Sequence, residues 1–119
     1  MHEFSICERI VETVLDELTK VPLPRGRLCR VRVVVGGLHR LVPDHLEFAY
    51  RVLTRDTDAE GSVLEVRESP VVVRCRSCSW EGEIDLPLFR CGACHALDLD
   101  LVSGKELYLE HLELDSDSA

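Results

Sequence analysis

The chain has 119 residues, enough for one modest core with a small metal-stapled appendage but too few for two ordinary independent domains. Its 14 basic and 22 acidic residues give a formal charge of −8, which opposes binding to a polyanion, so we expect no nucleic-acid partner. No apolar run approaches the roughly 18 residues of a membrane span, so we expect a soluble protein without a membrane partner.

The N-terminal third predicts one amphipathic helix followed by one strand. In residues 3–20 apolar side chains recur at steps of three and four, which is the pattern of a helix with one buried face. Pro22 and Pro24 end this helix because proline lacks an amide donor. Residues 28–35 alternate and predict a half-buried strand. The basic residues of this region are interpreted as charges that flank and decorate the strand: Arg25, Arg27, Arg30 and Arg32.

The middle and the end of the chain complete an α+β body. A second helix is predicted from Pro43 to residue 54, because proline suits the first helical position and apolar residues again recur with helical spacing. Residues 63–67 and 106–114 alternate and predict two further strands. The last strand returns most economically to the body, where it pairs with the other two. The predicted fold is therefore α+β, with two helices against a three-stranded sheet.

A pair of C-x-x-C arms, separated by twelve residues, interrupts this body. Each arm offers two thiolates on a tight turn, and the loop brings the pairs together as the tetrahedron of a closed structural zinc site. A rubredoxin-like iron site is the alternative. We predict a rubredoxin-like or zinc-ribbon module over residues 71–102, inserted into an α/β domain of residues 1–70 and 103–119. The predicted zinc ligands are Cys75, Cys78, Cys91 and Cys94.

The other potentially reactive residues favour structural roles. Because no apolar signal segment follows Met1, we expect a cytoplasmic chain whose thiols are reduced. Cys7 and Cys29 are interpreted as small core residues, and Trp80 is expected to pack over the zinc site or the body. His95 follows an arm and has three interpretations: orienting the knuckle, contacting a second metal, or lying in solvent. No catalytic triad, P-loop or dinucleotide fingerprint is present, which favours a protein that is not an enzyme.

Four stretches of the chain together resemble the HypA/HybF family. They cover nearly the whole chain in the right order, and the opening stretch is the most specific. The resemblance implies a nickel metallochaperone that matures nickel–iron hydrogenases, and in some bacteria also urease. It also implies a nickel-binding α/β domain with a zinc domain inserted before the last strand. The stretches are Met1-His2-Glu3-Phe4-Ser5-Ile6-Cys7-Glu8, Val33-Val34-Val35-Gly36, the two C-x-x-C arms, and Ser103-Gly104-Lys105-Glu106-Leu107.

The resemblance also implies ligands and partners. The family's nickel ligands correspond here to His2, the terminal amine of Met1 and the first backbone nitrogens, with Glu3 as an accessory. Asp44 matches an acidic loop residue that the family has near nickel. An α-amine, peptide nitrogens and an imidazole close chelate rings that suit Ni(II) or Cu(II). The implied partners are an accessory GTPase and the hydrogenase large-subunit precursor. Two other functions stay open from sequence: a zinc-ribbon adaptor without nickel transfer, and a rubredoxin-like electron carrier.

Overall fold

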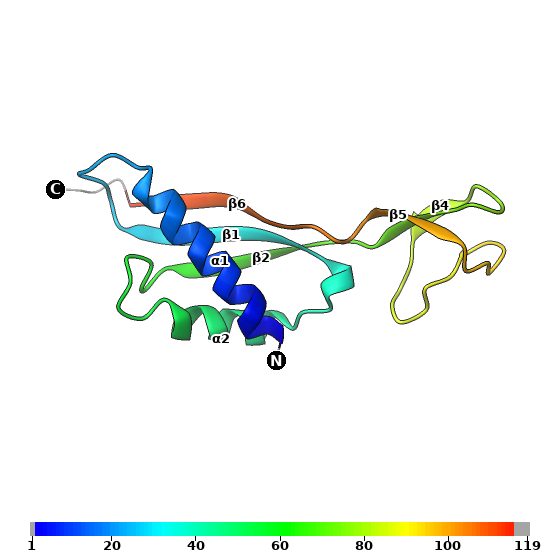
Figure 1. Cartoon of the computed structure of the whole chain (residues 1–119), viewed down its shortest axis with the longest axis horizontal. Coiled ribbons are helices and arrows are strands. Elements are labelled where there is room, and N and C mark those ends of the chain that lie inside the picture. The colour runs from blue at the N-terminus through cyan, green and yellow to red at the C-terminus, as the bar shows by residue number, and fades with distance from the viewer. Residues whose placement is uncertain (1, 116–119) are drawn as a thin grey trace. The chain divides into compact units, whose positions relative to one another are not determined.

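The computed structural model describes residues 2–115, which divide into two compact units (Figure 1). The described part of the first unit comprises residues 2–34, 41–67 and 108–115, and the second unit comprises residues 35–40 and 68–107. Within residues 2–115, none of the helices combines the length and the apolar character needed to cross a bilayer.

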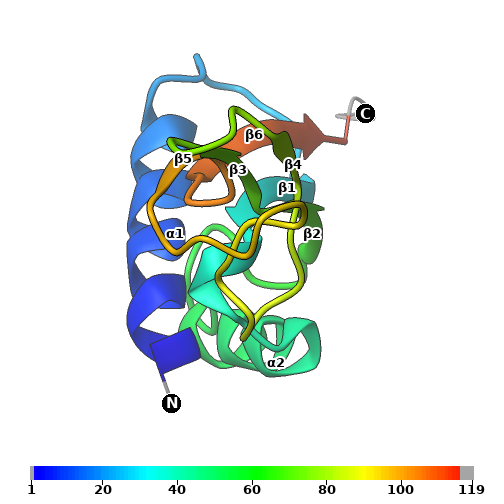
Figure 2. The same ribbon diagram turned by 90° about the vertical axis from the view of Figure 1, so that its right-hand side faces the viewer.

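The first unit contains the predicted helices and the predicted three-stranded sheet. Helix α1 is His2–Thr19 and helix α2 is Pro43–Leu53. The sheet has the strand order β2-β1-β6, in which β1 (Leu28–Gly36) is central between β2 (Val63–Ser69) and β6 (Leu107–Leu114). Figures 1 and 2 show α1 lying across one face of this sheet. The predicted fold class is thereby confirmed.

Helix α1 buries the apolar stripe that its sequence predicts. The stripe includes Cys7 and Val14, which are fully buried, and Leu18 at 2 % exposure. The Cys7 thiol contacts the carbonyl oxygen of Leu46 on α2 at 3.8 Å, and burial raises the pKa of Cys7 to about 12. Cys7 is therefore an unreactive core residue, as predicted from its place on the stripe.

The sheet has one buried and one charged face. On β1, Val31 and Val33 are fully buried, whereas the side chains of Arg30 and Arg32 are about half exposed. Both arginines form ion pairs with Glu65 of β2, with N···O distances of 3.2 and 3.1 Å. Such exposed pairs contribute only about 0–1 kcal/mol each, so they decorate the strands more than they stabilise them.

Helix α2 begins at a proline and ends on a buried hydrogen-bond chain. Val42 is its N-cap and gives no side-chain cap, while Pro43 occupies the first turn, where a missing amide proton costs little. Near the other end, Tyr50 is 1 % exposed, and its hydroxyl donates to the Ser62 hydroxyl at 2.7 Å. Ser62 in turn donates to the carbonyl oxygen of Ala59 at 2.6 Å, so the polar groups beneath α2 are satisfied.

The second unit is a small antiparallel sheet with its own core. Its strand order is β4-β3-β5, where β3 is Val72–Cys75, β4 is Glu81–Glu83 and β5 is Leu99–Ser103. Val73 of β3 is fully buried and pairs with Gly82 on one side and Leu101 on the other. The remaining core residues are Val71 and Ile84, against which Leu38, Trp80, Leu86, Leu99 and Leu101 pack.

Residues 35–40, which include the end of β1 and the 3-10 helix after it, group by their contacts with the second unit. Gly37–His39 forms a 3-10 helix, and the Leu38 side chain packs against the second core. The Leu38 amide donates to the carbonyl oxygen of Gly104 at 2.9 Å, and His39 Nε2 donates to that of Lys105 at 3.0 Å. The assignment of metals to the two domains stays a prediction.

Candidate metal centres

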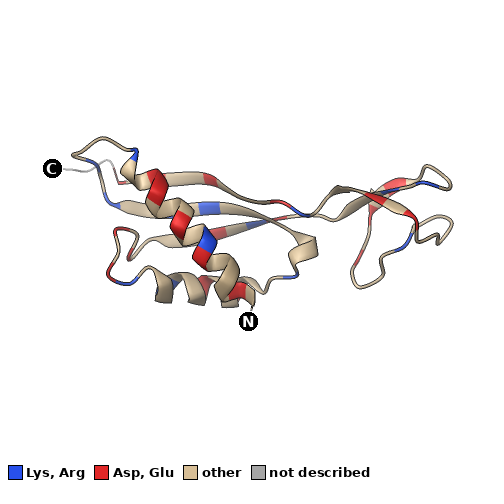
Figure 3. Cartoon of the chain, viewed as in Figure 1, with Lys and Arg blue, Asp and Glu red and all other residues tan. Residues whose placement is uncertain are grey.

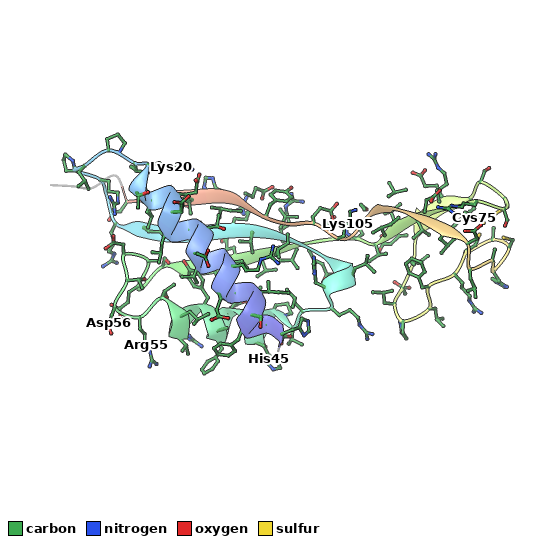
Figure 4. All side chains as sticks on the ribbon, viewed as in Figure 1. Lys20, His45, Arg55, Asp56, Cys75 and Lys105 are labelled. Carbon is green, nitrogen blue, oxygen red and sulfur yellow. The ribbon has the colours of Figure 1, made fainter. Side chains whose placement is uncertain are left out.

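The predicted cysteines form one compact cluster of sulfur atoms. All four Sγ atoms lie within 4.8 Å of one another, and the Cys75–Cys94 and Cys78–Cys91 pairs are each 3.6 Å apart. Sulfurs at the corners of a tetrahedral Zn–S₄ site are separated by about 3.8 Å, since each Zn–S bond is about 2.3 Å. None of the four cysteines forms a disulfide, and their sulfur spacing is close to that of a tetrahedral zinc site (Figure 4 labels Cys75).

Two equivalent backbone turns build this cluster. In each turn the first cysteine is buried and its sulfur accepts two backbone N–H groups, whereas the second cysteine is exposed. Donation from the Cys78 amide lowers the pKa of Cys75. For Cys91, burial opposes the change, but two amide donors lower its pKa to about 6. The donors are Ser77 and Cys78 to Cys75, at 3.3 and 3.5 Å, and Ala93 and Cys94 to Cys91, both at 3.3 Å.

Trp80 packs inside the second unit, against the second of these turns. A Cβ built on Gly92, between the cysteines of that turn, would lie 2.7 Å from Cζ2 of the indole. A Cβ on Gly82 of β4 would lie 2.5 Å from the same atom. The indole therefore requires glycine at both positions, and it connects the small core to the cysteine turn. Of the two locations expected for Trp80, the structure shows the one beside the cysteines.

His95 does not join the cluster. It is exposed, has a left-handed φ of 65°, and its amide donates to the carbonyl oxygen of Cys91 at 3.1 Å. His95 lines a shallow hollow of about 260 Å³, together with Glu83 and Asp85. Within residues 2–115, the four cysteines are the only group of three or more histidine, cysteine or acidic side chains arranged to hold an ion. This arrangement favours the interpretation of His95 as a solvated residue.

Two of the predicted nickel ligands, His2 and Glu3, lie at the first turn of α1, in the first unit. Met1 lies outside the described residues. His2 is the first residue of α1, and its side chain is 54 % exposed. Glu3 is only 5 % exposed, and its Oε2 accepts the Val42 amide at 3.1 Å. Its Oε1 lies 4.0 Å from Nδ1 of His2.

The buried carboxylate of Glu3 is stabilised in its charged form. The Val42 amide donates a hydrogen bond to this carboxylate, and the amide of Glu3 itself makes a smaller contribution. Together they lower the pKa of Glu3 to about 2. Glu3 is thus ionised at neutral pH, and it joins the start of α1 to the N-cap of α2. Asp44 is exposed on the first turn of α2, two residues beyond Val42. Within the described residues, His2, Glu3 and Asp44 do not by themselves form a group arranged to hold an ion.

Sequence reasoning missed the tie between Glu3 and Val42. Glu3 was singled out as an accessory ligand, but it occupies the buried stripe that an apolar residue would normally take. Its place three residues before Ile6 and four before Cys7 puts it on the inner side of the helix, and a carboxylate there requires a donor. The spacing therefore indicated that Glu3 is buried and needs a hydrogen-bond donor. The identity of the donor depended on the tertiary contact with α2.

An α+β unit with a four-cysteine ribbon inserted before its last strand defines a class of small metal-binding proteins. The family model described as "Hydrogenase/urease nickel incorporation, metallochaperone, hypA" matches residues 1–114. The hydrogenase maturation factor HypA of Solidesulfovibrio magneticus is 38 % identical, over 97 % of this chain and 100 % of the relative. That of Desulfosudis oleivorans is 36 % identical, over 96 % and 98 %. The chain belongs to the HypA family.

Solved structures share the fold. The solution structure of the Ni metallochaperone HypA from Helicobacter pylori superposes with a TM-score of 0.66 at 20 % identity, covering 98 % of this chain and 100 % of the other. A second solution structure of a HypA protein gives a TM-score of 0.65 at 21 % identity and covers 98 % of both chains. At these identities the likeness concerns the fold alone.

Proposed function

We propose that the chain is a nickel metallochaperone, which binds Ni(II) at its N-terminus and delivers it during maturation of a nickel–iron hydrogenase, with urease as a second target class. One observation carries the proposal. A closed four-sulfur cluster and an exposed His2 occur in separate units of a chain that a nickel-incorporation family matches over residues 1–114. One site is built to retain its ion and the other to exchange it.

Zinc is the resident ion that we assign to Cys75, Cys78, Cys91 and Cys94. Four thiolates leave no coordination position open, so the ion supplies folding free energy to the second unit and no catalysis. In small zinc-finger peptides this contribution is on the order of 10 kcal/mol. The amide donors to Cys75 and Cys91 support the assignment, since they stabilise thiolates before an ion binds.

Nickel is the cargo, and we assign it to the amine of Met1, the first backbone nitrogens and the imidazole of His2. Asp44 is a further candidate ligand. Glu3 acts as an accessory: its Oε2 accepts the Val42 amide, while its Oε1 faces the His2 ring and helps to orient it. Because peptide nitrogens must lose their protons, binding strengthens as pH rises and the ion is released on protonation.

The exchange of nickel requires protein partners, and the chain itself is not an enzyme. We propose an accessory GTPase of the hydrogenase maturation system and the large-subunit precursor as those partners. GTP hydrolysis belongs to the GTPase, because this sequence contains no phosphate-binding loop. A cytoplasmic location follows from the same proposal, since the thiols of the cluster must stay reduced to bind zinc.

Metal analysis of the purified, untagged protein tests the proposal against its competitors. We expect one tightly held zinc per chain, together with nickel that can be loaded, removed by a chelator and loaded again. Zinc without nickel uptake would instead indicate an interaction adaptor. A coloured protein that contains iron would indicate an electron carrier and would refute the zinc assignment.

A further inference from the structure

An aromatic patch is left uncovered at the end of the first unit where α1 begins. Phe48 of α2 is 53 % exposed, and Val42 before this helix is 43 % exposed. Phe4, on the first turn of α1, is half-buried and contacts Phe48 edge to face, with ring centroids 6.3 Å apart and an interplanar angle of 75°. We call Phe4, Val42 and Phe48 the aromatic patch.

The patch is not needed for the core of its unit. Helix α2 already buries Leu46, Ala49 and Tyr50 on its inner side, and Phe48 lies on the opposite side of the helix. A single exposed apolar residue is ordinary on a protein surface. Here, however, two aromatic rings in contact and a valine all flank the turn that carries His2 and Glu3. Exposed aromatic side chains of this kind mark sites of protein association.

Acidic side chains border the patch. Glu8 lies one turn beyond Phe4 on α1, and Asp44 lies one turn before Phe48 on α2, beside Glu47; all three acids are exposed. Two exposed bases lie near the patch in sequence, Arg40 two residues before Val42 and Arg51 one turn after Phe48, so the three acids outnumber them. Figure 3 shows that acidic residues also predominate along the rest of α1. The border is therefore negative on balance, and it attracts a surface that carries lysine or arginine.

We propose that the aromatic patch is the docking surface for the protein that exchanges nickel with this chain, and that this protein presents apolar side chains bordered by basic ones. The inference rests on the proposed function and specifies the chemistry of the partner. Contact at the patch covers the first turn of α1, so the partner meets the cargo site and excludes water around His2. The acidic border speeds encounter, and the aromatic rings hold the complex.

The accessory GTPase from the same source, purified, is the probe, and calorimetry measures its binding to the nickel-loaded chain. Phe48→Gln keeps helical propensity and removes the ring, and we expect binding to weaken about 30-fold, as for an aromatic hot spot. Val42→Thr, which adds a favourable N-cap, should weaken binding in the same direction. The matched control is Val63→Thr on β2, because Val63 is 58 % exposed and lies outside the patch; it should bind as the native chain does.

The charges provide an independent readout. Glu8→Gln combined with Glu47→Gln should flatten the dependence of the dissociation constant on ionic strength, since added salt screens exposed charges. Equal binding of the native chain and Phe48→Gln would overturn the docking proposal. So would a loss of nickel affinity in Phe48→Gln, which would make the ring part of the metal site. So would a native dimer that Phe48→Gln dissociates while binding of the GTPase is unchanged.

The docking proposal and the proposed function can fail separately. A native chain that takes up no nickel refutes the function. A native chain that takes up nickel but does not bind the GTPase refutes docking to this partner and leaves nickel binding in place.

Discussion

Extending the chain by a few residues before Met1 tests the N-terminal nickel site directly. The extension converts the terminal amine, whose pKa is ordinarily about 7.7–8.0, into an amide with no comparable donor strength. His2 and Glu3 remain in place, and only the position of the chain end changes. Because a first coordinating group is lost, we expect nickel affinity to fall by more than about 100-fold, above the 10–100-fold typical of outer-shell changes.

The stability of the fold should hardly change. The His2 side chain is 54 % exposed, and the bond from the Val42 amide to Glu3 does not involve the chain end. Substitutions at such surface positions usually change the free energy of unfolding by less than about 0.5 kcal/mol. Thermal unfolding and zinc content should therefore match those of the native chain, so that a loss of nickel binding reports the site and not the fold.

Isothermal titration with nickel, together with absorption spectroscopy, compares the native, extended and His2→Ala chains. A matched control is the extended chain after a protease has restored Met1 as the first residue, which should regain full affinity. An extended chain that binds nickel as tightly as the native one, with the same spectrum, would refute the terminal-amine site. A cluster of side chains around His39, Asp44 or His95 would then be the alternative, although those residues do not form a closed group in the described structure.

Three further perturbations have distinct readouts. Cys78→Ala should abolish zinc retention and amide protection in the second unit while α1 and its sheet stay folded; unchanged zinc content would contradict the assignment. The pKa of Glu3 is lowered to about 2 from an ordinary 4.5, so its contribution to stability is complete above pH 4.5 and is lost as the pH falls toward 2. Glu3→Gln should remove that part of the acid dependence of the melting temperature, and an identical acid profile would contradict the role of the Val42 amide. Gly92→Ala should displace Trp80, destabilise the second unit by about 1–3 kcal/mol and shift the tryptophan fluorescence, whereas an unshifted spectrum would contradict the packing.

The features predictable from sequence were those set by local periodicity and spacing. The helical stripe of α1, the proline at the start of α2, the alternation of three strands and the two C-x-x-C arms each follow from residues close together in the chain. The four sulfurs lie together as the spacing of the two arms predicted. Cys7 could be recognised as a core residue because helical periodicity places it on the buried face of α1.

The features missed by sequence reasoning depend on contacts between distant segments. Strand β4 has only three residues, Glu81–Glu83, and nothing in this short segment marks it as a strand. Leu38 lies between the strand and the second helix predicted from sequence, and it packs against the second core because the segments near residues 37 and 104 hydrogen-bond to each other. The edge-to-face contact between Phe4 and Phe48 likewise joins residues 44 positions apart in sequence.

The two proposed metal functions differ in the way in which the chain supplies their ligands. Cys75 and Cys91 are buried, and each sulfur accepts backbone amide donors. The proposed nickel donors lie instead at the exposed start of a helix, where an ion can be approached from solvent or by a partner. Thiolate ligands retain zinc, whereas nitrogen donors at a chain end favour nickel through geometry and bind copper still more tightly. If nickel is bound and exchanged as proposed, selective delivery requires control of which metal reaches the N-terminus, because affinity alone favours copper.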